Sequence, residues 1–254
     1  MGGEGDTVFL RDVAPGIHMI QNHHVNCYLL EDSRGLTLVD AGLPRVWNEL
    51  GWAVRELGRT PQDIRALVLT HAHFDHVGVA AKLVRRLGIP VYAHEKERHL
   101  AAHPYSYAHE RPTAVYPLRH PRAVPVLGSM LAGGAAAVRG VDVTRELTAG
   151  QTVPVPGSPR VVATAGHTWG HCALHLPDAD AVITGDALVT LDPYTGLTGP
   201  RIVAGAATAD ADMALASLAA IADTGVGLVL PGHGDPWRLG AVRAASQGRA
   251  NGVA

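Results

Sequence analysis

The apolar positions of this chain fall into short blocks whose length and spacing are typical of strands and helices. Short apolar runs with the character of buried strands lie at 26–30, 36–39, 66–69 and 89–93. Helices are predicted at 46–57, 77–87 and 95–102. Gly58 and Gly88 follow the first two of these helices, as glycines do at helix ends. Strands that alternate with helices in this way predict an α/β layered architecture.

The pattern changes in the middle of the chain and then returns. Residues 103–145 are rich in proline, histidine, tyrosine and arginine and have no regular period. We interpret them as an insertion that covers a pocket, with surface packing as the alternative. Strands are predicted again at 160–163, 173–176, 181–184 and 227–230. Residues 209–223 predict an amphipathic helix, and we expect a frayed end after Gly248. One domain is expected over 1–254.

Composition narrows the class of protein. Of the 254 residues, 47% are hydrophobic and 17% are charged, which excludes an intrinsically disordered chain. The formal net charge is −2 and the basic residues form no dense cluster, so no nucleic-acid partner is expected. Cys27 and Cys172 are too few for a disulfide framework. No signal sequence is visible and no apolar run reaches the ~20 residues of a membrane span, so we expect a cytoplasmic protein without a membrane partner.

The chain contains 15 histidines, and they are densest in the segment His71-Ala-His73-Phe-Asp75-His76. In an extended chain, residues i and i+2 point to the same side, so His71 and His73 can bind one metal ion. Asp75 and His76 lie where the chain turns into the next helix and can reach a neighbouring point. Burying these groups without a metal or partners would be costly. The alternative is a polar loop with solvated histidines, which the motif disfavours.

Polar residues at the ends of later strands extend this group. They are His167, Asp186 and His233, and each follows an apolar, strand-like run. Alone, such a residue is more often a cap or a satisfied polar group. Together with the segment 71–76, these residues indicate a metal site.

The order of these motifs resembles that of the metallo-β-lactamase-fold hydrolase superfamily. The motifs are His-x-His-x-Asp-His at 71–76, Gly-His-Thr-x-Gly-His at 166–171, Gly-Asp at 185–186 and Gly-His-Gly at 232–234. The resemblance implies an αββα sandwich, with two mixed sheets between outer helices and a dinuclear site at one edge. Its implied ligands are His71, His73 and His167 for one metal, Asp75, His76 and His233 for the other, and Asp186 bridging both. Asp40 matches a buried aspartate of the family that would orient a ligand imidazole.

The implied ligand set has a chemical rationale. Imidazoles and carboxylates without a thiolate suit zinc, and also iron, manganese or cobalt. We expect two zinc ions per chain, with iron or manganese as the alternative. Two adjacent cations lower the pKa of a bridging water towards ~7 and polarise a substrate carbonyl. Asp75 is the expected catalytic residue, because it can also orient the nucleophile or pass a proton to the leaving group. His171 is expected to support the site without binding metal, since the other ligands fill it.

The ligand set is most similar to that of glyoxalase II, acyl-homoserine lactonases and related hydrolases, in which an aspartate bridges the metals as Asp186 would. The resemblance therefore implies hydrolysis of an ester, lactone or thioester of a small molecule. β-Lactam cleavage is less expected, because β-lactamases of this fold usually lack that aspartate. Trp169 stands where many relatives have proline. Lactonases have a tyrosine that can reach the substrate carbonyl. Tyr194 is a candidate for that role, but its spacing from Asp186 does not match, and a core or surface role is expected.

Two other functions stay open. One is a mononuclear Fe(II) persulfide dioxygenase, in which His71, His167 and Asp186 would hold the metal. The other is a metal-binding protein without turnover, which an intact ligand set disfavours. The substrate itself is not identified, although 103–145 and 192–204 predict a mixed, mostly apolar pocket lining. The expected partner is a small-molecule substrate, and a homodimer is left open.

Overall fold

The computed structural model describes residues 7–254 and contains two sheets that face each other. The larger sheet has strand order β1-β2-β3-β4-β5-β6-β7. Its strands are β1 (Thr7–Ala14), β2 (Ile17–Asn22), β3 (Val25–Asp32), β4 (Gly35–Val39), β5 (Ile64–Val68), β6 (Val91–Ala93) and β7 (Arg145–Glu146). The pairs from β1 to β4 are antiparallel and those from β4 to β7 are parallel, so the sheet is mixed.

The second sheet has strand order β13-β10-β9-β8. Its strands are β8 (Arg160–Ala163), β9 (Cys172–Leu176), β10 (Ala181–Gly185) and β13 (Leu228–Pro231). Only the β10–β13 pair is parallel. A separate two-stranded ribbon pairs β11 (Val189–Leu191) with β12 (Thr198–Arg201).

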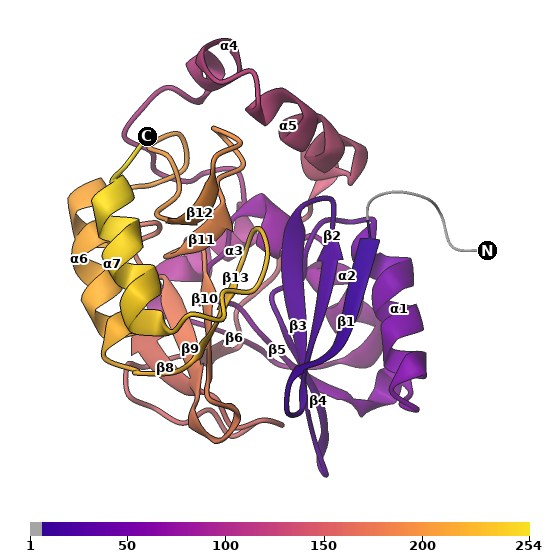
Figure 1. Ribbon diagram of the computed structural model, residues 1–254. Coiled ribbons are helices and arrows are strands. Elements are labelled where there is room, and N and C mark those ends of the chain that lie inside the picture. The colour runs from indigo at the N-terminus through magenta and orange to yellow at the C-terminus, as the bar shows by residue number, and fades with distance from the viewer. Residues whose placement is uncertain (1–6) are drawn as a thin grey trace.

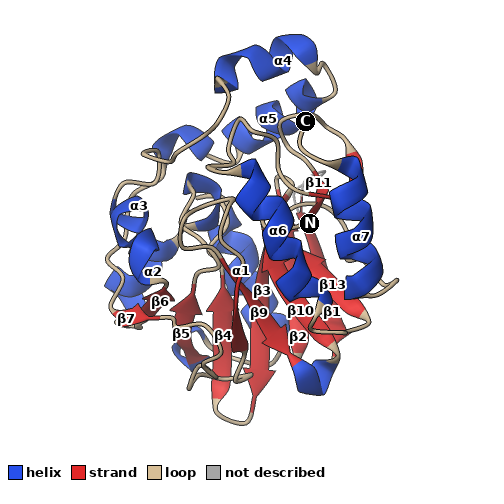
Figure 2. Cartoon of the chain, turned by 90° about the vertical axis from the view of Figure 1, so that its left-hand side faces the viewer, coloured by secondary structure: helices blue, strands red, loops and turns tan. Residues whose placement is uncertain are grey.

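Helices cover the outer face of each sheet (Figures 1 and 2). Beside the larger sheet lie α1 (Val46–Glu56), α2 (Ala80–Leu87) and the short α3 (Arg98–Ala102). Beside the smaller sheet lie α6 (Ala211–Ala222) and α7 (Ala241–Asn251). The remaining helices, α4 (Tyr116–Arg119) and α5 (Ala123–Ala132), lie together at one end of the molecule. None of the helices within residues 7–254 has both the length and the apolar character needed to cross a bilayer.

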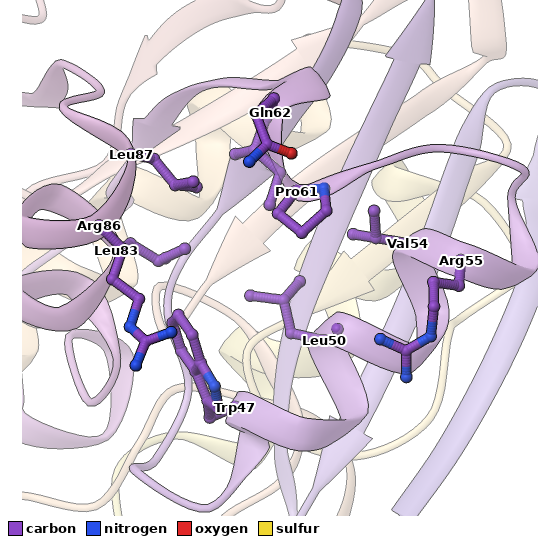
Figure 3. A pocket seen from close by; sticks show the side chains of 11 residues that line it. Trp47, Leu50, Val54, Arg55, Pro61, Gln62, Leu83, Arg86 and Leu87 are labelled. Atoms are coloured by element: carbon purple, nitrogen blue, oxygen red, sulfur yellow. The ribbon is translucent and has the colours of Figure 1, made fainter.

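Three apolar clusters fill the spaces between these layers. One joins the larger sheet to α1 and α2, and includes Leu38, Leu50 and Leu83. A central cluster lies between the two sheets and includes Tyr28 and Ile183. The third packs α6 and α7 against the smaller sheet. The order of the layers is therefore helix, sheet, sheet, helix, which confirms the αββα sandwich that the resemblance implies. On the outer surface, α1 and α2 also leave a cavity between them (Figure 3).

The observed elements include most of the predicted ones. The strands β1, β2, β7, β11 and β12 and the helices α4 and α7 were absent from the predicted elements. The expectation of a frayed end after Gly248 is wrong, because α7 continues to Asn251 and the carbonyl oxygen of Ala254 accepts a hydrogen bond from the Tyr116 hydroxyl. The expectation that the chain has no signal sequence concerns the N-terminal segment, and residues 1–6 of that segment lie outside the described residues.

Residues 103–145 run over the end of the molecule as a chain of short helices and loops. In α5, Val126 and Met130 pack against Val25 and Leu43 from the larger sheet and the loop that follows β4. The segment is therefore joined to the sandwich by apolar contacts. The interpretation of this segment as an insertion stays a prediction.

Candidate metal centre

The histidines and aspartates singled out in the sequence come together at one edge of the sandwich, where strands of both sheets end. The segment His71–His76 connects β5 to α2, and its last three residues form a short 3-10 helix. His167 lies in the loop between β8 and β9. Asp186 directly follows β10, and His233 follows β13. β10 and β13 are parallel neighbours, so their carboxyl ends lie at the same edge of the smaller sheet, and the segment after β5 of the larger sheet lies against that edge.

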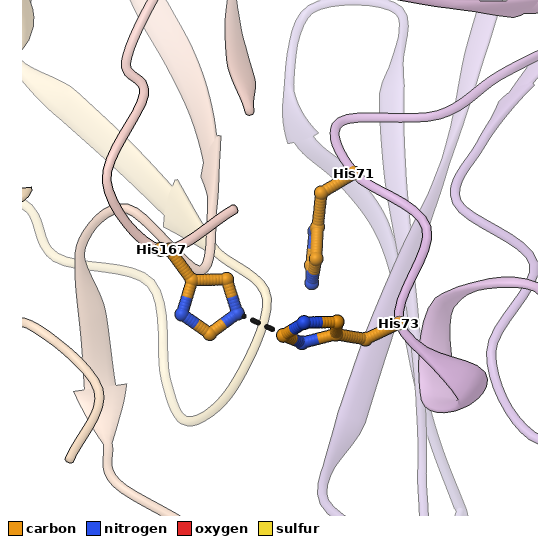
Figure 4. A group of neighbouring side chains, drawn as sticks. All are labelled: His71, His73 and His167. Atoms are coloured by element: carbon orange, nitrogen blue, oxygen red, sulfur yellow. Dashed lines mark hydrogen bonds between the residues drawn. The ribbon is translucent and has the colours of Figure 1, made fainter. Parts of the chain in front are cut away.

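The first group of side chains is His71, His73 and His167, all of them buried. One nitrogen of each lies within 4.8 Å of the others. Nε2 of His167 is 3.0 Å from Nδ1 of His73, and the His71 ring points toward the same space (Figure 4). Two nitrogens bound to one tetrahedral zinc ion lie about 3.3 Å apart, so the group has the spacing of a metal site.

The second group is Asp75, His76 and His233, which are also buried. Nε2 of His233 lies 3.3 Å from Oδ2 of Asp75. Nε2 of His76 lies 3.9 Å from the same oxygen. These groups bring two imidazoles and one carboxylate to a common point.

Asp186 lies between the two groups. Its Oδ2 atom is 3.8 Å from Nε2 of His71 and 3.5 Å from Nε2 of His167, both in the first group. The same oxygen is 3.3 Å from Nε2 of His233, and Oδ1 is 3.5 Å from Nε2 of His76, both in the second group. One carboxylate thus faces candidate ligand atoms of both groups, as a bridging ligand would.

The donor atoms of this centre fit a metal ion. Within the described residues, the buried Nε2 atoms of His71, His76 and His233 and the Oδ1 atom of Asp186 have no hydrogen-bond partner. Buried polar atoms are rarely left without a partner, so unpaired atoms that converge on one space indicate a missing ligand. Nitrogen and carboxylate oxygen donors suit zinc or iron.

The protonation of the first group also fits metal binding. Burial lowers the pKa of His71 and His167 well below the usual value and lowers the pKa of His73 to about 4. These imidazoles are therefore neutral at pH 7, which is the form that binds metal.

In the second group, burial also disfavours the charged imidazole, but nearby carboxylates outweigh it. Asp186 and Asp75 raise the pKa of His233 to about 10, and together with Asp40 they raise the pKa of His76 well above its usual value. In the absence of a metal, these two imidazoles hold protons that balance the charge of the carboxylates. A metal cation at the same point would take over that role.

Asp40 contacts one histidine of the second group directly and one histidine of the first group through Thr70. It is buried at the end of β4, in a left-handed backbone conformation with φ of 57° that is uncommon outside glycine. Nδ1 of His76 lies 3.0 Å from Oδ2 of Asp40. The Thr70 hydroxyl donates to the same oxygen and lies 3.0 Å from Nδ1 of His71. Asp40 thus orients His76 directly and His71 through Thr70. Thr70 had not been singled out in the sequence.

Glu97 is a second buried acid that sequence reasoning missed. Its carboxylate accepts hydrogen bonds from the backbone amides of Ala72 (2.9 Å) and Gly170 (2.8 Å). Ala72 lies between His71 and His73, and Gly170 follows the His167 loop. Glu97 therefore ties together the two loops that carry the first group. Its position at the start of α3, among exposed charged residues, gave no local signal of burial.

His171 lies behind Asp186. Its Nε2 atom accepts a hydrogen bond from the backbone amide of Asp186 (3.1 Å), and Nδ1 lies 2.8 Å from the Thr164 hydroxyl. Burial lowers the pKa of His171 to about 3, so the ring is neutral. Both ring nitrogens are occupied within the protein, which places His171 among the residues that position the centre.

The backbone also approaches the centre closely at Gly232. A Cβ atom at this position would collide with the Asp186 carboxylate and with the ring of His76. The glycine before His233 is therefore required by space, because any side chain would push the carboxylate away from the two groups.

A small cavity opens beside the first group. It has a volume of about 130 Å³, and its lining includes His167, Tyr107, Leu100 and Trp169. The ring of Tyr107 lies 4.5 Å from the ring of His73, and Trp169 is 45% exposed. Tyr107 belongs to 103–145, from which part of the pocket lining was expected.

Tyr194 is buried and its ring stands edge-on to that of Tyr116 at 6.3 Å. Burial raises the pKa of Tyr194 well above its usual value, and the neighbouring Tyr107 and Asp75 raise it further. The hydroxyl is therefore protonated. Tyr194 packs with Tyr116 and Val189 in an apolar cluster, which agrees with the expected core role.

Comparison with known proteins gives one consistent family. A family model described as the metallo-beta-lactamase superfamily matches residues 21–233. The Bacillus subtilis protein named "Probable metallo-hydrolase YflN" is 27% identical over 247 residues, which covers 89% of this chain and 86% of that protein.

Solved structures agree with this match. TTHA1623, solved in a di-iron-bound form, is 26% identical with a TM-score of 0.60, covering 92% of this chain and 94% of that one. The class B3 di-zinc metallo-beta-lactamase LRA-12, from an Alaskan soil metagenome, has a TM-score of 0.65. It is 18% identical over 96% of this chain and 90% of its own, so its likeness concerns the fold alone.

Proposed function

We propose, from the premise that this chain belongs to the metallo-beta-lactamase superfamily, that it is a hydrolase with a dinuclear metal centre. The observation that carries the proposal is the position of Asp186. Its carboxylate faces His71 and His167 on one side and His76 and His233 on the other. A carboxylate that reaches both groups supports two metal ions that share a ligand.

Each residue of the centre then has a role. His71, His73 and His167 would hold one metal, Asp75, His76 and His233 the other, and Asp186 both. When bound, two such cations supply a hydroxide at neutral pH and polarise a substrate carbonyl. Asp75 would also orient the attacking oxygen and pass a proton to the leaving group. Asp40 and His171 would keep the ligands in position.

We propose zinc as the metal, and an ester, lactone or thioester of a small molecule as the substrate. The cavity beside His167 has a mixed lining, in which Leu100 and Trp169 offer apolar surface to a small acyl group beside polar side chains such as Ser106. The Tyr107 hydroxyl is protonated and belongs to the lining of this cavity, where it supplies a hydrogen-bond donor near the centre.

The geometry favours this proposal over the alternatives from the sequence. A mononuclear iron site formed by His71, His167 and Asp186 would give no role to the second group. For β-lactam cleavage, the structural likeness to LRA-12 is one of fold alone, at 18% identity. A metal-binding protein without turnover would need the same ligands, and the assays below separate it from a hydrolase.

The test is elemental analysis of the protein purified without added metal, followed by assays with lactones, thioesters and esters. We expect zinc at about two ions per chain and hydrolysis of at least one of these classes. About one iron per chain, together with oxygen uptake in the presence of a persulfide, would overturn the proposal. So would metal binding without hydrolysis of any ester-like bond.

A further inference from the structure

A second cavity lies away from the metal centre, between α1 and α2 on the outer face of the larger sheet (Figure 3). Its volume is about 490 Å³, within the range of small-molecule sites. The floor is apolar and buried, formed by Leu50, Val54, Ile64 and Leu83. The floor offers no polar group to a ligand, so it suits a hydrocarbon chain.

The rim of this cavity is positively charged. Arg55, in the last turn of α1, and Arg86, in the last turn of α2, line it with Leu50 between them (Figure 3). The acidic residues of the same helices and of the turn before β5 do not line it, namely Glu49, Glu56 and Asp63. In a chain of net charge −2, this is a local excess of positive charge.

The two guanidinium groups are available to a ligand. Within residues 7–254, neither Arg55 nor Arg86 has a side-chain hydrogen bond or an ion pair. Arg86 lies over the ring of Trp47 at 5.6 Å, and Lys82 lies over the same ring at 3.9 Å. The Trp47 ring therefore contacts two cationic side chains, and it adds apolar surface to the cavity lining.

We propose that this cavity binds an amphipathic organic anion, of the class of medium-chain carboxylates. The hydrocarbon chain would lie against Leu50, Val54 and Leu83, and the carboxylate would stay at the rim, where the guanidinium groups of Arg55 and Arg86 hold it. A small inorganic anion would leave the apolar floor without a partner. A neutral hydrocarbon would leave the cationic rim without one.

The site is independent of the metal centre. Both helices begin at the edge that carries the centre, α1 after Asp40 and α2 after His76, and run away from it. The cavity lining follows α1 from Trp47 to Arg55 and α2 from Leu83 to Leu87, with Pro61 from the turn before β5, and it includes no residue of the centre. A ligand bound there would contact none of the proposed metal ligands.

The test is calorimetric titration of the metal-loaded protein with decanoate. We expect saturable binding of one decanoate, at least ~10-fold weaker in the double variant Arg55→Gln/Arg86→Gln, because two charge-assisted contacts are removed. The matched control is Arg85→Gln, an exposed arginine of the same turn that does not line the cavity and should bind like the wild type. Circular dichroism of each variant checks its fold.

Three further ligands distinguish this site from a purely apolar pocket, a simple anion site and a membrane-binding surface. Decan-1-ol and acetate, which carry only the chain or only the head group, should each bind at least ~10-fold more weakly than decanoate. Absence of saturable decanoate binding, or equal affinity in the folded double variant, would overturn the proposal, and the latter would indicate binding at the metal centre. If the protein bound anionic phospholipid vesicles but not free decanoate, the cavity and its cationic rim would be a membrane-binding surface. This result would also overturn the proposal.

Discussion

The backbone amide of Asp186 donates a hydrogen bond to Nε2 of His171 over 3.1 Å. This contact holds the backbone of Asp186 in place, and the carboxylate of Asp186 lies between the two groups of candidate ligands. It requires a neutral His171 with a free electron pair on Nε2, and burial ensures this by lowering the pKa of the ring to about 3. The Thr164 hydroxyl beside Nδ1 then selects the tautomer.

Substituting His171→Ala should therefore reduce activity while most of the metal is retained. The Asp186 amide loses its acceptor, and the carboxylate is held less well. Removal of such a supporting residue typically costs about 10- to 100-fold in activity. Elemental analysis and kcat/KM of the same preparation measure both effects. His175→Ala, at a half-buried position on β9, is the control. Complete loss of metal from His171→Ala would show that His171 is itself a ligand.

Substituting Asp186→Ala should remove metal and activity together. The variant keeps the five imidazoles and the Asp75 carboxylate but has no carboxylate between the two groups, so two cations there would repel each other without a bridging charge. The metal content per chain after dialysis is the measurement, with Asp178→Ala at an exposed position as the control. An Asp186→Ala protein with full metal loading would rule out the bridging role.

Substituting Glu97→Gln should weaken the link between the two loops that carry His71, His73 and His167, although Glu97 is not a candidate ligand. The glutamine side chain can accept only one of the two backbone hydrogen bonds, from Ala72 or from Gly170, and its NH2 faces the other amide. A buried amide without an acceptor costs about 1–3 kcal/mol. We expect that loss in the free energy of unfolding by urea, and faster release of metal to a chelator.

The control for this prediction is Glu95→Gln, an exposed acid two residues away. It should match the wild type in both measurements. If Glu97→Gln were as stable as the wild type and released metal at the same rate, the link between the two histidine loops would have no energetic role.

The parts of the site that could be predicted are those in which local spacing decides the geometry. His71 and His73 alternate along an extended segment, so their side chains share a face whatever the rest of the chain does. Glu97 and Thr70 could not be found in this way. Their roles depend on β5, α3 and the β8–β9 loop meeting in space, and neither residue stands in a recognisable motif.

The helices and strands likewise divide into those that the local sequence pattern predicted and those that it missed. The strands β3, β4 and β10 are mostly apolar and mostly buried, and they were predicted. β1 was missed because six of its eight positions are exposed or half-buried, so its pattern lacks the apolar face of an interior strand. α7 was missed because its buried side consists of small residues, such as Ala241, Ala244 and Gly248, that give a weak apolar periodicity.

The metal-free protein should lose stability as the pH rises above neutrality. In the folded chain, burial is outweighed by Asp186 and Asp75, and the pKa of His233 is raised to about 10, against about 6.5 when unfolded. A base with a raised folded-state pKa contributes stability that is complete below the unfolded pKa and is lost as the pH rises through the folded pKa. The imidazoles with lowered pKa act in the opposite direction near pH 6.5, where the unfolded chain still protonates them, and this contribution is nearly complete by about pH 7.5.

Urea unfolding of chelator-treated protein between about pH 7 and about pH 8 measures this effect, because most histidines of the unfolded chain are then neutral and most of its cysteines are still protonated. The free energy of unfolding should decline over this interval, and the decline should be smaller in His233→Gln. The metal-loaded protein should show little decline, because the metal replaces the proton on His233. Equal slopes in wild type and His233→Gln would contradict the proposed pairing with the carboxylates.

Substituting Trp169→Ala should weaken substrate binding and leave the metal in place. Trp169 lines the cavity beside His167 but contributes no ligand atom, and its exposed face is available to an acyl group. Loss of that apolar surface should raise KM roughly 10-fold for the best substrate, with kcat less affected. Trp52→Ala is a closely matched control, because Trp52 is 44% exposed against 45% for Trp169 and does not line this cavity. A fall in kcat at unchanged KM would instead show that Trp169 acts on the centre through the loop that carries His167.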